Sequence, residues 1–104
     1  MFNNQGFPTL SRLEFKVLDL LIEKGIALES YGMELVQNSK GMLKRGSVYV
    51  TLGRMEDKGY ITSRKEDIRP SHRGLPRRLY KITGTGQQMY DAYSTFTNIQ
   101  LKGV

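Results

Sequence analysis

The sequence predicts an α+β fold that is mostly α: a winged helix-turn-helix followed by a C-terminal dimerisation helix. Three observations carry this prediction: a short helical pattern within residues 46–61, a strand directly after it, and a basic loop leading to a second strand that ends in PRRLYKIT. A length of 104 residues is typical of one domain. We therefore expect residues 1–83 to form the winged helix-turn-helix and residues 84–104 to form the C-terminal dimerisation helix of the same compact domain.

The first helix is expected over Ser11–Lys24. Ser11 is followed three residues later by Glu14, which is the pattern of a capping box, and apolar residues then recur at helical spacing until Gly25. These apolar positions cover more than one stripe of the helix. This predicts burial against the domain itself and against something else.

A second, shorter helix should follow a turn at Gly25 and end near Asn38–Gly41. It carries Tyr31, Leu35 and Val36 on one face. Gly32 lies within this pattern and lowers helix propensity by roughly 1 kcal/mol relative to alanine.

The third helix should begin at Ser47, whose hydroxyl can accept a backbone N–H as an N-cap, and should end before Gly59. Its core-facing stripe is apolar at i, i+4 and i+7: Val48, Leu52 and Met55. The opposite face is slim and mostly polar, which suits a helix that enters a major groove about 12 Å wide. On that face we expect Ser47, Val50, Thr51, Arg54 and Lys58.

Two short strands are expected after Gly59, at Tyr60–Lys65 and Leu79–Thr83, with Tyr80 and Ile82 on one side of the second strand. The connection between them contains Pro and Gly residues that break regular structure. It is longer than the usual hairpin loop of about two to five residues. Two strands joined by a long basic loop form a wing.

A terminal helix is expected from about Thr85 to Ile99, with an apolar stripe along one side. Because little other apolar surface is left to cover this stripe, a second copy of the chain in a two-fold dimer is the simplest partner. The alternative is that the helix folds back on its own domain. The expected dimer interface comprises Leu13, Val17, Met89, Tyr93, Phe96 and Ile99.

Positive charge is concentrated in the middle of the chain. The formal net charge is +6, and the segment Lys40–Lys81 holds twelve Lys and Arg against four Asp and Glu, a net +8 that leaves −2 for the remainder. A polyanion-binding surface requires this kind of segregation. The alternative is a basic surface that is merely solvated.

The composition excludes several classes of protein. There is no cysteine, so disulfides, thiolate metal sites and cysteine nucleophiles are excluded. His72 is the only histidine, which leaves no metal site by the usual spacing and predicts a solvated wing residue. We find no nucleophile with a base and no paired carboxylates, so no cofactor and no enzymatic activity are expected. No apolar run approaches the roughly 20 residues that a membrane-spanning helix needs, and the N-terminus lacks the pattern of a signal peptide, which predicts a cytoplasmic protein without a membrane partner.

The residues GSVYVTLGRMEDKGYI at positions 46–61 resemble the recognition helix of the PadR family of bacterial transcriptional regulators. The likeness extends to Tyr31–Leu35, which is similar to the family's second helix, and to Arg78–Thr83, which is similar to its second wing strand. The length resembles the short subfamily, which has a single C-terminal helix for dimerisation. Val50 and Gly53 depart from the family pattern, which often has a proline and a basic residue at these places.

The resemblance implies a homodimeric regulator that binds specific sequences in double-stranded DNA, namely a repressor released by a small-molecule effector. Two other functions stay open. One is a winged-helix replication or partition factor of a plasmid or phage, and the other is a winged helix that binds proteins and never touches nucleic acid. The concentrated positive charge argues against the second of these, since such modules need no strong positive field.

The expected DNA contacts come from three places. Lys44 and Arg45 precede the third helix, where the partial positive charge of its N-terminus adds to theirs. On the helix, Arg54 can donate in fork geometry to guanine or phosphate, or else pair with Asp57. The wing should reach the backbone or the minor groove. The full set is Lys44, Arg45, Ser47, Tyr49, Val50, Thr51, Arg54, Arg69, Arg73, Arg77 and Arg78.

Aromatic residues near the terminal helix have two interpretations. Such residues at helical spacing are more often the core of an interface. The resemblance also implies a pocket for a small aromatic effector in this region. The residues expected to line it are Phe15, Tyr90, Tyr93 and Phe96.

Overall fold

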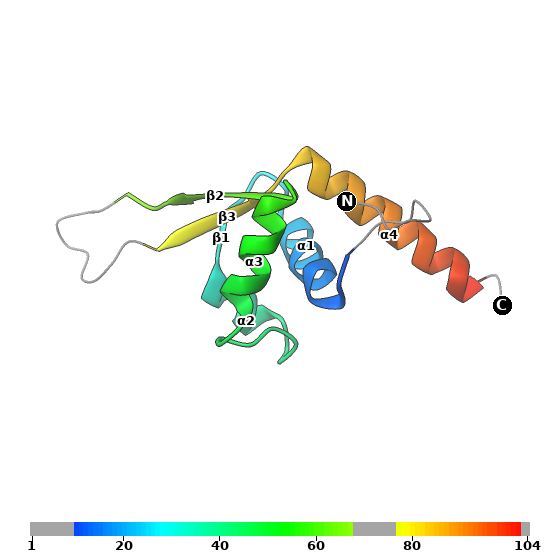
Figure 1. Cartoon of the computed structure of the whole chain (residues 1–104), viewed down its shortest axis with the longest axis horizontal. Coiled ribbons are helices and arrows are strands. Elements are labelled where there is room, and N and C mark those ends of the chain that lie inside the picture. Colours follow the sequence, from blue (N-terminus) through cyan, green and yellow to red (C-terminus); the bar gives the residue numbers. More distant parts are fainter. Residues whose placement is uncertain (1–9, 68–76, 103–104) are drawn as a thin grey trace.

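The computed structural model describes residues 10–67 and 77–102, with residues 97–102 described by their backbone alone. The described chain forms four helices, as the sequence predicts, and a three-stranded antiparallel sheet of which the sequence predicts the two wing strands (Figure 1). In chain order the elements are α1 (Arg12–Lys24), β1 (Ser30–Tyr31), α2 (Gly32–Asn38), α3 (Val48–Asp57), β2 (Ile61–Lys65), β3 (Arg78–Ile82) and α4 (Gly84–Lys102).

The predicted start of α1 is confirmed. The Glu14 backbone N–H donates to the Ser11 hydroxyl at 3.1 Å, and the Ser11 backbone N–H donates to Glu14 Oε1 at 2.8 Å, so both halves of the capping box are formed. The inward face of α1 is fully buried at Val17 and Leu18. Burial of such side chains supplies most of the stability of a helix of this length.

The predicted core stripe of α3 is also confirmed, because Val48, Leu52 and Met55 are at most 1% exposed. The predicted hydroxyl cap is wrong. Ser47 stands at the N-cap position, but its side chain accepts no hydrogen bond from the helix. Its carbonyl instead accepts from the Thr51 backbone N–H at 3.2 Å and from the Thr51 hydroxyl at 3.4 Å.

The wing strands pair as predicted. β2 and β3 are antiparallel with Ile61 opposite Ile82 and Lys65 opposite Arg78. Tyr80 and Ile82 lie on the same face of β3 and are each 4% exposed. Gly59 has φ +80°, a left-handed conformation that glycine adopts readily, and this turn carries the chain from α3 into β2.

The strand β1 was not predicted. Ser30 pairs with Tyr80 and Tyr31 pairs with Leu79, so the sheet order is β1-β3-β2. Tyr31, expected on the second helix, therefore lies in a strand and just precedes α2. No local pattern marks a strand of two residues, because alternation needs about four.

The terminal helix α4 extends beyond the predicted range at both ends. Figure 1 shows it leaving the body at the side opposite to the wing strands. Its first half packs on α1, where the Phe15 ring stacks on the Tyr90 ring at 4.8 Å between centroids and contacts the Tyr93 ring at 4.9 Å. Among the described residues, no helix has both the length and the apolar character that crossing a membrane requires.

Candidate nucleic-acid interface

The exposed face of α3 is the centre of the predicted interface. Tyr49 is 50% exposed and Val50 is 56% exposed, and Arg54 lies on the same open side of the helix. Thr51 does not belong to this face, so its prediction as a groove contact is wrong. It is 7% exposed, because it falls between Val48 and Met55 on the core stripe.

Lys58 was also expected on the open face of α3, but its ammonium group turns toward α1. It donates to Glu14 Oε2 at 2.8 Å, and the Glu14 side chain is 4% exposed. This ion pair ties the C-terminal end of α3 to the N-terminal end of α1.

Lys44 and Arg45 lie beside the N-terminal end of α3, as predicted. The Lys44 carbonyl accepts from the backbone N–H groups of Ser47 and Val48 at 3.2 and 2.9 Å, which holds the preceding turn against the helix. Both basic side chains belong to exposed residues. Within residues 10–67 and 77–96, neither forms an ion pair.

Tyr49 is held against the start of α2. A Cβ atom added to Gly32 would lie 2.6 Å from Tyr49 Cε1, so the ring rests directly on glycine backbone. Any larger residue at this position would displace the ring. Gly32 therefore sets where the exposed tyrosine of α3 lies.

Arg77, predicted to contact DNA, is engaged at the base of the wing. Its Nε donates to Glu66 Oε1 at 2.9 Å, and its guanidinium carbon lies 3.8 Å from the centroid of the Tyr31 ring. Hydrogen bonds from Arg77 lower the pKa of Glu66 to about 2. The charge of Arg77 is thus compensated within the protein.

Two other cations of the wing strands remain uncompensated. Lys65 and Arg78 are paired across β2 and β3, are both exposed, and form no ion pair with any carboxylate that the structure describes. Arg78 Nε donates to the Ser63 hydroxyl at 2.9 Å, which leaves its other donors available. Arg64, by contrast, binds both oxygens of Glu29 at 2.8 Å. The predicted contacts Arg69 and Arg73, and also His72, lie outside the described residues.

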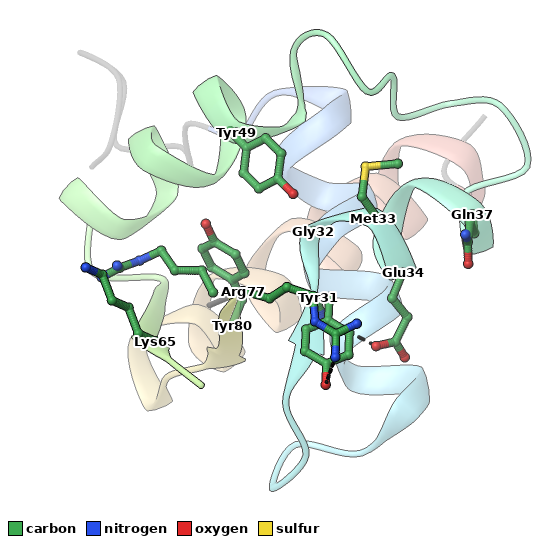
Figure 2. A pocket seen from close by; sticks show the side chains of 10 residues that line it. Tyr31, Gly32, Met33, Glu34, Gln37, Tyr49, Lys65, Arg77 and Tyr80 are labelled. Carbon is green, nitrogen blue, oxygen red and sulfur yellow. Dashed lines mark hydrogen bonds between the residues drawn. The ribbon is translucent and has the colours of Figure 1, made fainter. Parts of the chain in front are cut away.

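A hollow of about 700 Å³ lies between the exposed face of α3 and the strands β2 and β3 of the wing (Figure 2). Gly32 and Met33 of α2, Tyr49 of α3, and Lys65 and Arg78 of the wing strands border it. Figure 2 shows Tyr49 on one side, with Lys65 and the Arg77–Tyr31 pair on the other. Three segments that are distant in the sequence build this hollow, so no local sequence pattern predicts it.

The predicted dimer and effector residues are only partly available at the surface. Val17 is fully buried and Met89 is 3% exposed, so the prediction that they face a partner is wrong: both belong to the core of the protomer. Leu13, Tyr93 and Phe96 are partly exposed, and the side chain of Ile99 lies outside the described residues. Phe15 of α1 packs on both Tyr90 and Tyr93 of α4.

An exposed helix, a preceding helix packed on it and a two-stranded wing define the class of winged helix-turn-helix proteins. Residues 17–92 match the family model described as the transcriptional regulator PadR-like family, and the chain belongs to this family. The family consists of transcriptional regulators, in agreement with the expectation of a regulator and not an enzyme. A comparison with curated protein sequences gave no significant match.

Solved structures of other PadR proteins share the fold. A PadR family regulator from Clostridium difficile is 22% identical with a TM-score of 0.72, and the match covers 88% of this chain and 93% of that one. One from Eggerthella lenta is 24% identical with a TM-score of 0.70, covering 88% and 76%. PadR of Bacillus subtilis, solved in complex with operator DNA, is 25% identical with a TM-score of 0.67, covering 80% of this chain and 47% of that one.

Proposed function

We propose that this chain is a cytoplasmic, homodimeric repressor that binds specific sequences in double-stranded DNA and is released by a small-molecule effector. One observation carries the DNA-binding part: the open face of α3 presents Tyr49, Val50 and Arg54 beside the uncompensated cations of the wing strands. The family and the operator complex of the Bacillus subtilis relative support the same assignment.

In this proposal α3 enters the major groove and Arg54 reads base edges. Arginine suits that role because its planar fork can donate two hydrogen bonds to guanine. Lys44 and Arg45 at one end of α3, and Lys65 and Arg78 in the wing, contact phosphates. Phosphate contacts position the protein without reading the sequence.

The dimer places two copies of α3 on a pseudo-palindromic site, about one helical turn apart. The partly exposed residues Leu13, Tyr93 and Phe96 supply the partner-facing surface in this proposal. Light scattering at micromolar concentration is the test. A mass corresponding to a single chain of 11.9 kDa would contradict the dimer.

The experiment for DNA binding begins with selection of a preferred duplex from a random pool by the purified protein. Arg54→Ala should then weaken binding to the selected duplex by about 1 to 3 kcal/mol and change binding to random duplex little. Lys65→Ala should weaken binding to the selected and the random duplex about equally. It should also reduce the slope of log K against log salt concentration by about one. If the protein ignores duplex DNA at low salt, or if both variants lose equally on both duplexes, the proposal fails.

Repression is tested by transcription in vitro from a promoter that contains the selected site. The protein should lower transcript yield in proportion to occupancy of the site. Activation by the bound protein would refute the assignment as a repressor.

A further inference from the structure

Val50 is the most exposed of the large apolar side chains that the structure describes. It lies in the first turn of α3, is 56% exposed and is not part of the hydrophobic core. Valine is also a weaker helix former than alanine, because its branched side chain loses freedom in a helix. Neither the packing of the protomer nor the formation of α3 therefore explains a valine at this position.

The position of Val50 on α3 distinguishes it from a single apolar side chain elsewhere on the surface. Gly53 follows three residues later and Arg54 four residues later, so the three residues are neighbours on one open side of the helix. A Cβ atom added to Gly53 would meet nothing within 4 Å, so the surface next to Val50 is open at this point. This gap lets a partner approach the helix closely enough for the short valine side chain to touch it.

Cations surround this side of the helix. Lys44 and Arg45 precede α3 and are exposed without an ion pair in the described part of the chain, and Arg54 is exposed as well. A polyanion is therefore the partner that the surroundings of Val50 attract. In a DNA duplex, the major groove is wide enough to admit a helix and bring its side chains to the base edges.

Thymine offers the major groove a chemical group that suits valine. Its 5-methyl group is the only apolar group that the edges of unmodified base pairs present in this groove. Valine has neither a donor nor an acceptor, so against the amino group of cytosine it would displace water and return no hydrogen bond. Contact with thymine buries apolar surface on both sides instead, and removing one methyl group from water is worth about a fourfold change in Kd.

We propose that Val50 is a specificity-determining residue that reads the 5-methyl group of a thymine in the major groove, near the base pair that Arg54 contacts. The valine supplies apolar contact, whereas the arginine supplies hydrogen bonds. This inference deepens the proposed function and rests on it, since Val50 can reach a base only if α3 enters the groove. The family pattern often has a proline at this position, so the family likeness assigns no such role to Val50.

The test uses the duplex selected by the native protein and replaces its thymines by deoxyuridine, one equivalent pair of the two half-sites at a time. Deoxyuridine lacks the methyl group and keeps the base pairing. At one pair of thymines this change should raise the Kd of the native protein about fourfold per half-site, or about fifteenfold in all. Val50→Ala should raise the Kd for the unmodified duplex by a similar factor, and deoxyuridine at that pair should then have no further effect. If no thymine is sensitive in the native protein, or if the sensitive pair is equally sensitive in Val50→Ala, the inference is overturned.

Leu28→Ala is the matched control, because Leu28 is apolar, 50% exposed and outside α3. It should leave both the Kd and the response to deoxyuridine unchanged. A loss equal to that of Val50→Ala would overturn the assignment, because the loss of any exposed apolar side chain would then suffice. Circular dichroism verifies that each variant is folded, and alanine in place of Val50 should not weaken the helix.

The failure of this inference and the failure of the proposed function give different results. A protein that binds no duplex refutes the proposed function, and the contact with thymine falls with it. A protein that binds the selected duplex and loses specificity in Arg54→Ala, but responds to no methyl group, keeps the proposed function and loses only the role of Val50.

Discussion

The guanidinium of Arg77 lies 3.8 Å from the centroid of the Tyr31 ring, and its Nη2 donates to the Tyr31 hydroxyl at 3.1 Å. The two residues are 46 positions apart, so this contact ties the wing to the edge strand β1 and the start of α2. Arginine suits the position because its flat guanidinium can stack on the ring while its edge binds a carboxylate. A cation that the sequence assigns to DNA thus holds the wing in place.

Glu66 should make stability depend on pH in the acidic range. Its folded-state pKa of about 2 lies below the usual 4.5, so its pairing with Arg77 stabilises the fold fully above the unfolded value and is lost as pH falls toward about 2. Glu66→Gln should therefore lower the Tm most at neutral pH, and the difference from the native protein should close on acidification. Thermal unfolding between about pH 2 and 7 measures this.

The control for this prediction is the same substitution in an Arg77→Ala background. There Glu66 has lost its main partner, so Glu66→Gln should change the pH profile little. A difference of the same size in both backgrounds would show that the stabilisation does not come from Arg77.

Gly86 should tolerate no side chain. A Cβ atom added there would overlap the Tyr60 carbonyl oxygen, which belongs to the backbone and cannot rotate away. Gly86→Ala should lower the free energy of unfolding by about 1 to 3 kcal/mol, the range for an overpacked site. Gly84→Ala is the matched control, since nothing lies within 4 Å of its added Cβ. Urea denaturation of the two variants should separate them clearly, and similar stabilities would contradict the close contact.

The ion pair between Lys58 and Glu14 should contribute more than the pair between Lys16 and Asp19 on α1. Lys58→Ala leaves the buried Glu14 carboxylate with the Ser11 backbone N–H as its remaining described donor, so we expect a loss of about 1 to 3 kcal/mol in unfolding free energy. Lys16→Ala breaks a partly exposed pair with Asp19 at 3.9 Å and should cost less than about 0.5 kcal/mol. Equal losses in urea denaturation would refute the larger contribution expected of the buried pair.

Elements with a local signature could be predicted from the sequence. The capping box at Ser11 and Glu14 and the stripe of α3 depend on residues within one or two turns of each other. The strand β1 exists only because β3 offers a free edge, a relationship between distant segments. Thr51 lies at i+3 from Val48 and therefore belongs to the core stripe of α3. Because threonine is polar, the sequence pattern placed it on the open face of the helix instead.

The site could be predicted only in part, because charge counts do not reveal pairing. Arg77 meets Glu66 across 11 positions, and Arg64 meets Glu29 across 35. Nothing in the order of the residues distinguishes these paired cations from Lys65 and Arg78. The hollow beside Tyr49 depends on the same long-range packing, so it emerges only from the fold.

Gly32 and Tyr49 should be coupled in stability. In the native protein, Gly32→Ala drives a Cβ atom into the Tyr49 ring, which must move away; because this ring is the far end of a half-exposed side chain, we expect a loss of about 0.5 to 1 kcal/mol in unfolding free energy. In a Tyr49→Ala background the same substitution meets no ring and should be nearly neutral. The four proteins form a double-mutant cycle, and a coupling above about 0.5 kcal/mol by urea denaturation supports direct contact. Strictly additive losses would mean that the ring does not depend on the glycine, and that something else positions the exposed tyrosine of α3.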